Sequence, residues 1–137
     1  MIFVDTNVVS ETMRKSPSTV VLDWIEANDS VIALPAVVVA EIAFGIQKIR
    51  ESERAARLSR GLDAWRERYA GRIFSFDEAA AISYGEIMGS ASRSGTTMSA
   101  PDGMIAAIVQ ANEGVLATRN VADFSSSGIK LVDPWVR

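Results

Sequence analysis

Short apolar runs alternate along this chain with longer segments in which apolar residues recur every three or four positions. Short runs of β-forming residues between polar turns are typical of buried strands, and the longer spacing is typical of helices with one buried face. The pattern predicts strands at 1–4, 31–34, 72–76, 114–117 and 128–132. It predicts helices between them, at 8–13, 17–28, 35–49, 50–69, 77–95 and 101–112. Strands that alternate with helices indicate an α/β fold with a five-stranded parallel sheet flanked by helices.

The length and composition fit one domain that spans residues 1–137. The chain is 48% hydrophobic, which is enough for a proper core, and it has no room for a second domain. It contains neither cysteine nor histidine. Disulfides, thiolate or imidazole metal sites and catalysis by a histidine acid or base are therefore excluded. Any chemistry must come from carboxylates, hydroxyls, lysine or a bound metal.

The chain shows no targeting or membrane signal. No basic segment precedes its apolar start, and the longest uncharged stretch is interrupted by Pro35 and Glu41. We therefore expect a soluble, cytoplasmic protein with no membrane partner. Its net charge of -3 argues against a nucleic-acid partner, but the segment from Lys48 to Arg72 holds eight basic and four acidic residues and is locally +4.

The first predicted strand ends at an acidic residue, Asp5, in the sequence MIFVDTNVV. In open α/β sheets, ligands bind in the crevice outside the carboxyl ends of the strands, so Asp5 is expected in a functional site. The alternative is that Asp5 or Asn7 only caps the helix that follows.

Three further acidic residues have a similar placement. Glu41 is the only charged residue between Ser30 and Gln47, on a helix that is predicted to be apolar all round. A carboxylate in such a place is costly unless it is paired or bound to a cation. The alternative is that Glu41 lies close enough to a helix end to reach water. Asp102 lies at a helix start, where the helix dipole alone favours an acid, and Asp123 follows the fourth strand, where a turn would suffice. Together, four carboxylates on one rim indicate a hard cation, Mg²⁺ or Mn²⁺.

These four acids stand in FVDTNVVSE, VVVAEIAFG, PDGMIAAI and TRNVADF, which resemble, in order and approximate spacing, the four acidic motifs of PIN-domain ribonucleases. The nearest resemblance is to the VapC-like (FitB-like) toxins of bacterial toxin–antitoxin pairs, and it spans the whole chain. It implies a three-layer PIN-like fold, a magnesium-dependent endoribonuclease, a homodimer, and a small DNA-binding antitoxin that blocks the site. The loop 96–100 lacks residues often seen before the third motif, which bears on substrate preference.

The expected chemistry is metal-assisted hydrolysis of an RNA phosphodiester bond. Asp5 and Asp102 are the expected metal ligands, and Glu41 and Asp123 would act directly or through water. The expected supporting residues, which hold these carboxylates or a phosphate oxygen, are Thr6, Asn7, Thr118 and Asn120.

Two other functions remain open on the sequence alone. A signalling receiver domain also has a parallel sheet, acidic strand ends and Mg²⁺, but Asp5 has no acidic neighbour and no lysine follows a late strand in the right place. A PIN fold could also act mainly as a binding module, as co-repressor with its antitoxin on operator DNA.

The resemblance also suggests how an antitoxin would bind. We expect some apolar side chains of the first helices to form a groove for its tail, which would place a basic side chain among Asp5, Glu41 and Asp102. The candidates are Val20, Val21, Trp24, Ile25, Ile42, Phe44 and Ile46. The alternative is that they all belong to the core or to a dimer interface.

Overall fold

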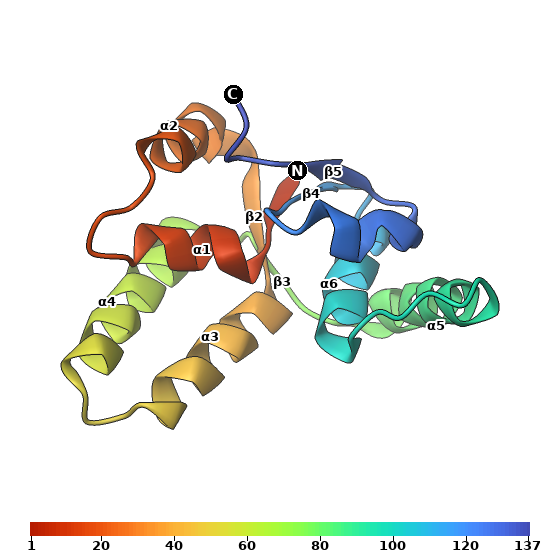
Figure 1. Cartoon of the computed structure of the whole chain (residues 1–137), viewed down its shortest axis with the longest axis horizontal. Helices are drawn as coiled ribbons and strands as arrows, with labels where there is room; N and C mark the ends of the chain where they lie inside the picture. The colour runs from red at the N-terminus through yellow and green to blue at the C-terminus, as the bar shows by residue number, and fades with distance from the viewer.

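The computed structural model describes residues 1–137 and contains a five-stranded, fully parallel sheet (Figure 1). The strand order is β3-β2-β1-β4-β5, as expected for a sheet whose strands are joined by helices. The strands are β1 (Ile2–Val4), β2 (Ile32–Pro35), β3 (Ile73–Phe74), β4 (Val115–Ala117) and β5 (Lys130–Val132). All five predicted strands are present, although β3 and β5 are shorter than predicted.

The helices form a layer on each side of this sheet. In Figure 1, α1 to α4 lie on one side and α5 and α6 on the other, which confirms the expected three-layer arrangement. The α-helices are α1 (Thr6–Thr12), α2 (Thr19–Asn28), α3 (Ala36–Lys48), α4 (Glu53–Arg68), α5 (Glu78–Arg93) and α6 (Ala100–Ala111). The chain also has two 3₁₀ helices, η1 (Asp29–Val31) and η2 (Val121–Ser127). None of the helices combines the length and the apolar character needed to cross a membrane.

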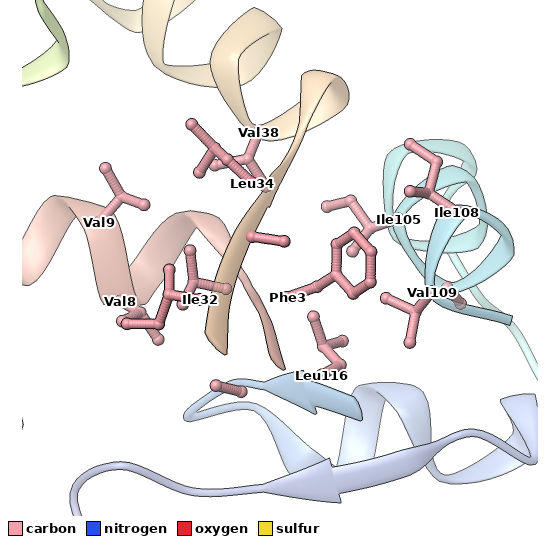
Figure 2. Close-up of a cluster of buried hydrophobic side chains, with 14 of the residues drawn as sticks. Phe3, Val8, Val9, Ile32, Leu34, Val38, Ile105, Ile108, Val109 and Leu116 are labelled. Carbon is pink, nitrogen blue, oxygen red and sulfur yellow. The ribbon is translucent and has the colours of Figure 1, made fainter. Parts of the chain in front are cut away.

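The core is built on both faces of the central strands. Successive side chains of a strand point to opposite faces, so each strand serves both helical layers. Phe3 points toward Ile105 and Val109 of α6, whereas Ile32 lies toward Val8 of α1 (Figure 2). All five side chains are fully buried. The paired central strands β1 and β2 are therefore held between the two helical layers (Figure 2), which fixes the position of the residues that follow β1.

Strand β1 lies at the centre of the sheet, and the later strands are added first on one side of it and then on the other. The chain first adds β2 and β3 on one side of β1, and then crosses over to add β4 and β5 on the other. The Asp5 N–H donates to the Ala117 carbonyl at 2.9 Å, so the residues just beyond β1 and β4 remain side by side. This topological switch point is where open α/β folds place their ligands.

Four differences from the sequence-based predictions concern the surroundings of Asp5, Glu41 and Asp123. Helix α1 begins earlier, at Thr6, because Asp5 caps it. Helix α4 begins at Glu53 and not at residue 50, because Glu51 has a left-handed backbone conformation (φ 72°) and Ser52 caps the new helix. Asp123 lies in η2, a short helix that was not predicted. Helix α3 is not buried all round: its second half projects from the molecule, and Phe44 is 67% exposed.

Candidate active site

The Asp5 carboxylate lies at the centre of the candidate site and is only 5% exposed. Its Oδ1 accepts a hydrogen bond from the Thr6 N–H at 2.8 Å. Its Oδ2 accepts one from the Thr118 hydroxyl at 2.7 Å and one from the Asn7 amide at 3.3 Å. Asp5 is thus both a helix cap and a buried carboxylate at the switch point, so the two interpretations of this residue are compatible. These donors fix the carboxylate in one orientation.

Thr118 connects Asp5 to the loop that follows β4. Its side chain is fully buried, and its hydroxyl accepts hydrogen bonds from the Asn120 N–H at 3.0 Å and the Asn7 amide at 3.3 Å. The Asn7 side-chain oxygen, Oδ1, in turn accepts from the Arg119 backbone N–H at 3.3 Å. The start of α1 and residues 118–120 are therefore held together by a polar network around Asp5.

Glu41 reaches this network through Thr6. The Thr6 hydroxyl donates to Glu41 Oε1 at 2.7 Å, while Glu41 Oε2 has no hydrogen-bond donor in the structure. Thr6 therefore joins two acidic residues, since its N–H binds Asp5 and its hydroxyl binds Glu41. Glu41 is half-buried and lies on the second turn of α3.

Asp102 lies in the first turn of α6, with Ser99 as the N-cap that accepts its N–H at 3.3 Å. Burial raises the pKa of Asp102 to about 6, and the negative charge of Asp5 adds to this effect, with smaller contributions from Glu41 and Asp123. Burial also raises the pKa of Asp5, although the hydrogen bonds from Thr118 and Thr6 oppose the shift. The charges of Glu41 and Asp123 raise the pKa of Asp5 further.

These four acids form a single electrostatic group, the acidic rim (Asp5, Glu41, Asp102 and Asp123). Like charges oppose one another's ionisation, and a bound cation would remove that repulsion. The rim offers only oxygen donors, the type that Mg²⁺ and Mn²⁺ prefer. No three acidic side chains converge closely enough to form a ready-made cation cage. The rim therefore fits a hard divalent cation in charge and donor type, and closing around one would require rotation of the more exposed acidic side chains.

Comparison with known families identifies the fold. The family described as "PIN domain" matches residues 2–126. The chain belongs to the PIN-domain family. Its relatives include the VapC ribonuclease Y4jK of Sinorhizobium fredii, 35% identical over 137 residues, which covers 98% of each protein. Toxin FitB of Neisseria gonorrhoeae is 34% identical over 140 residues, which covers 98% of this chain and 99% of that protein.

Solved structures of PIN-domain toxins have the same architecture. FitAcB from Neisseria gonorrhoeae superimposes with a TM-score of 0.91 and 32% identity, over the full length of both chains. FitAB bound to an IR36 DNA fragment superimposes with a TM-score of 0.90 and 31% identity, over 100% of this chain and 97% of that one. The predicted PIN-like fold is therefore confirmed, and the receiver-domain alternative is wrong. PIN-domain nucleases of the VapC type generally depend on a divalent metal.

The four acids that the sequence analysis selected lie near enough for their charges to act on Asp5 and Asp102, although no three of them converge on one point. Of the predicted supporting residues, Thr6, Asn7 and Thr118 contact Asp5 or Glu41 directly. Asn120 contributes only its backbone N–H, which donates to Thr118, and its exposed side chain makes no hydrogen bond. Asp123 is exposed and makes no side-chain hydrogen bond, so it belongs to the rim through its charge alone.

Sequence reasoning missed two polar residues of this region. Ser99 was treated as part of a loop, although a serine three residues before Asp102 is a typical capping pattern. Glu11 is only 5% exposed and accepts hydrogen bonds from the Ser18 N–H at 2.9 Å and from Arg14 at 3.1 Å. It lies one helical turn after Asn7, so the helix period could have placed it on the same face.

The apolar side chains among which a groove was expected lie in different places. Val21 and Ile42 belong to the core, while Phe44 is exposed. A cleft of about 590 Å³ between α1, α3 and α4 contains Ile42 but none of the α2 candidates. Val20 and Trp24 line a separate, smaller cleft of about 310 Å³ beside the C-terminus. Some of the candidates therefore do line a cleft, but those of α2 and α3 line different ones.

Proposed function

We propose that this PIN-domain chain is the endoribonuclease toxin of a toxin–antitoxin pair, and that the acidic rim hydrolyses RNA phosphodiester bonds with Mg²⁺ or Mn²⁺. The observation that supports this most is Asp5: a buried carboxylate at the switch point, held by three donors and coupled by charge to Glu41, Asp102 and Asp123. Relatives that match nearly the whole chain are named VapC ribonuclease and toxin FitB. The proposed cleavage would take place in the cytoplasm.

A bound divalent cation lowers the pKa of a coordinated water and stabilises negative charge on a phosphate. Asp5 and Asp102 would hold the cation, and Glu41 and Asp123 would complete the site directly or through water. Asp5 needs no further ordering, since its hydrogen bonds already fix it. Glu41 Oε2 is free to accept a proton from a water, because the Thr6 hydroxyl occupies only Oε1.

The partner is proposed to be a small antitoxin that binds this toxin and neutralises it. The matched structures at 32% and 31% identity are named FitAcB and FitAB, and the relative FitB is named a toxin. The acidic rim offers a receptor for an arginine, which pairs bidentately with carboxylates and would compete with the cation. We also propose a homodimer as the toxin's own state.

A second role follows from one specific observation. The FitAB structure contains a DNA fragment, so that complex binds DNA. We propose that the chain also takes part in a DNA-bound complex through its antitoxin. This role would leave the acidic rim free for ribonuclease activity, because the antitoxin and not the rim would contact the DNA.

The proposed activity is tested by incubating the purified chain with RNA in millimolar Mg²⁺ and mapping the new RNA ends. We expect cleavage that EDTA stops, that Mg²⁺ or Mn²⁺ restores, and that leaves single-stranded DNA of the same sequence intact. Co-expression with the antitoxin should suppress the cleavage. RNA that stays intact under every metal condition, with a folded and antitoxin-free protein, would refute the proposed function.

A further inference from the structure

The cleft between α1, α3 and α4 leads to the acidic rim but has the opposite charge. Thr6, Asn7 and Glu41 lie at its rim end. Helices α3 and α4 run side by side away from the sheet and form its walls (Figure 1). Five basic residues line the cleft: Arg14, Lys48, Arg54, Arg57 and Arg119. Only two acids, Glu11 and Glu41, line it with them, so a protein with a net charge of -3 has a locally basic cleft beside its site.

Most of these cations have no acidic partner. Arg14 pairs with Glu11 at 3.1 Å, and the two charges cancel. Lys48, Arg54, Arg57 and Arg119 take part in none of the four salt bridges in the structure. The Arg57 Nε donates to the Met13 carbonyl at 3.1 Å, which holds this guanidinium at the wall without neutralising it. Unpaired cations along a cleft favour a polyanionic ligand.

An aromatic platform completes the cleft. The Arg119 guanidinium lies 5.0 Å from the centre of the Trp135 ring, and both residues line the cleft. The Arg119 N–H binds Asn7, which also binds Asp5, so this pair is tied to the polar network of the site. Aromatic and guanidinium planes are the surfaces on which unpaired bases stack, and they do so with little sequence preference.

We propose that this cleft is the binding groove for single-stranded RNA on its way to the acidic rim, an inference that rests on the proposed function. Lys48, Arg54 and Arg57 contact the phosphates of one strand. Trp135 and Arg119 together hold one unpaired base by stacking. The positive cleft attracts and orients the RNA, which the negative rim alone would repel. A double helix gains less from this arrangement, because its bases are already stacked.

The first experiment compares Arg54→Glu with Arg60→Glu in full-length chains that also carry Asp5→Asn, so that the RNA is not cut. Both arginines are exposed on α4 and the substitutions change the net charge equally, but only Arg54 lines the cleft. The probe is a short fluorescent single-stranded RNA, and anisotropy is measured over a range of salt concentrations. We expect Arg54→Glu to weaken binding about tenfold more than Arg60→Glu, with a salt slope shallower by about one unit.

The second experiment tests the stacking platform. Trp135→Ala should weaken binding of the same RNA about tenfold, and Trp135→Phe, which keeps a ring, should weaken it much less. Trp135 packs against the edge of the core, so thermal unfolding of both variants is recorded alongside. Arg119→Gln gives a second test without a cavity, because the Arg119 side chain is exposed and its backbone bond to Asn7 is retained. It should weaken RNA binding several-fold.

Cleavage kinetics separate this proposal from the function on which it rests. In chains with Asp5 intact, Arg54→Glu should raise KM and leave kcat unchanged. If the wild-type chain cuts RNA while Arg54→Glu and Arg60→Glu bind and cut it equally well, the groove is wrong and the nuclease stands. If Arg54→Glu weakens antitoxin binding and leaves RNA binding unchanged, the cleft belongs to the antitoxin and the proposal is overturned. A folded wild-type chain that neither binds nor cuts RNA contradicts both.

Discussion

At the scale of single residues, Thr6 is the link between two acids of the rim. Its N–H binds Asp5 and its hydroxyl binds Glu41 at 2.7 Å. Thr6→Val keeps the N–H and the shape but removes the hydroxyl, so Glu41 loses its only hydrogen bond. Residues that orient acidic ligands typically contribute 10- to 100-fold to activity. We therefore expect RNA cleavage to fall by about that factor, measured at saturating Mg²⁺.

Thr19→Val is the matched control, because Thr19 is exposed in the first turn of α2 and its hydroxyl makes no hydrogen bond. It should cleave RNA like the wild type. Equal activity of Thr6→Val and Thr19→Val would show that Glu41 needs no orientation by Thr6.

Asp102 makes the metal-free protein sensitive to pH. Its pKa is about 6 in the folded chain against 3.8 ordinarily, so between these values the folded state binds more protons than the unfolded state. Stability contributed by Asp102 is therefore greatest at low pH and is lost as the pH rises through about 6. The free energy of unfolding of Asp102→Asn minus that of the wild type should therefore rise by about 1 kcal/mol from pH 4 to pH 7. This figure is already reduced for the partial exposure of Asp102.

Urea unfolding in EDTA at several pH values measures this difference. The trend with pH is the informative quantity, because asparagine also loses the favourable interaction of an acid with the helix start. A stability difference between Asp102→Asn and the wild type that stays constant from pH 4 to pH 7 would show that the Asp102 carboxyl ionises normally.

At the scale of elements, the sequence predicted every strand and α-helix because their apolar spacing is local information. It could not predict how far α3 projects from the molecule, since that depends on what packs against the helix. Glu41 consequently lies at the edge of a cleft and not inside an apolar layer. The start of α4 was misplaced because the left-handed conformation of Glu51 has no signal in the apolar spacing.

Packing between α5 and α6 sets the position of Asp102, and Gly103 is the close contact. A Cβ added at Gly103 would lie 2.6 Å from the Met88 sulfur and 3.0 Å from the Tyr84 ring. Gly103→Ala should therefore destabilise the fold by about 1 to 3 kcal/mol, toward the lower end if the flexible Met88 side chain moves aside. Thermal unfolding measures this.

Gly85→Ala, a substitution in α5 of the same helix pair, is the control. A Cβ added at Gly85 meets nothing within 4 Å, and alanine is the better helix former, so this change should stabilise the fold by about 0.5 to 1 kcal/mol. A Gly103→Ala protein as stable as Gly85→Ala would mean that α5 and α6 are not in the close contact described.

At the scale of the whole molecule, the chain order of the four acids was enough to predict a common rim, because parallel strands end on the same edge of a sheet. The separations within the rim were not predictable, since they depend on the loops that carry the acids. The contribution of Arg119 was missed for the same reason, because it joins the site through the backbone N–H that donates to Asn7. The basic segment 48–72 was noted from the sequence, but only the fold places part of it beside the rim.

The rim should make the whole fold respond to divalent metal. A cation that binds only the folded chain stabilises it by mass action. It would also offset the burial, and the smaller repulsion between acids, that raise the pKa of Asp5 and Asp102. We expect the unfolding temperature to rise by several degrees from EDTA to millimolar Mg²⁺. Asp102→Asn should reduce this increase. The same midpoint with EDTA and with Mg²⁺, together with no heat of binding in a titration, would exclude a metal site on the rim.

RNA cleavage by Asp5→Asn and Asp77→Asn, side by side with the wild type in Mg²⁺, tests the role of the rim most directly. Both aspartates cap a helix, at α1 and α5, and asparagine is an equally good cap, so both variants should fold. The charge of Asp77 is not among those that raise the pKa of Asp5 or Asp102. We predict a loss of at least about 100-fold for Asp5→Asn and wild-type rates for Asp77→Asn. Wild-type cleavage by a folded, nuclease-free Asp5→Asn protein would contradict a catalytic rim centred on Asp5.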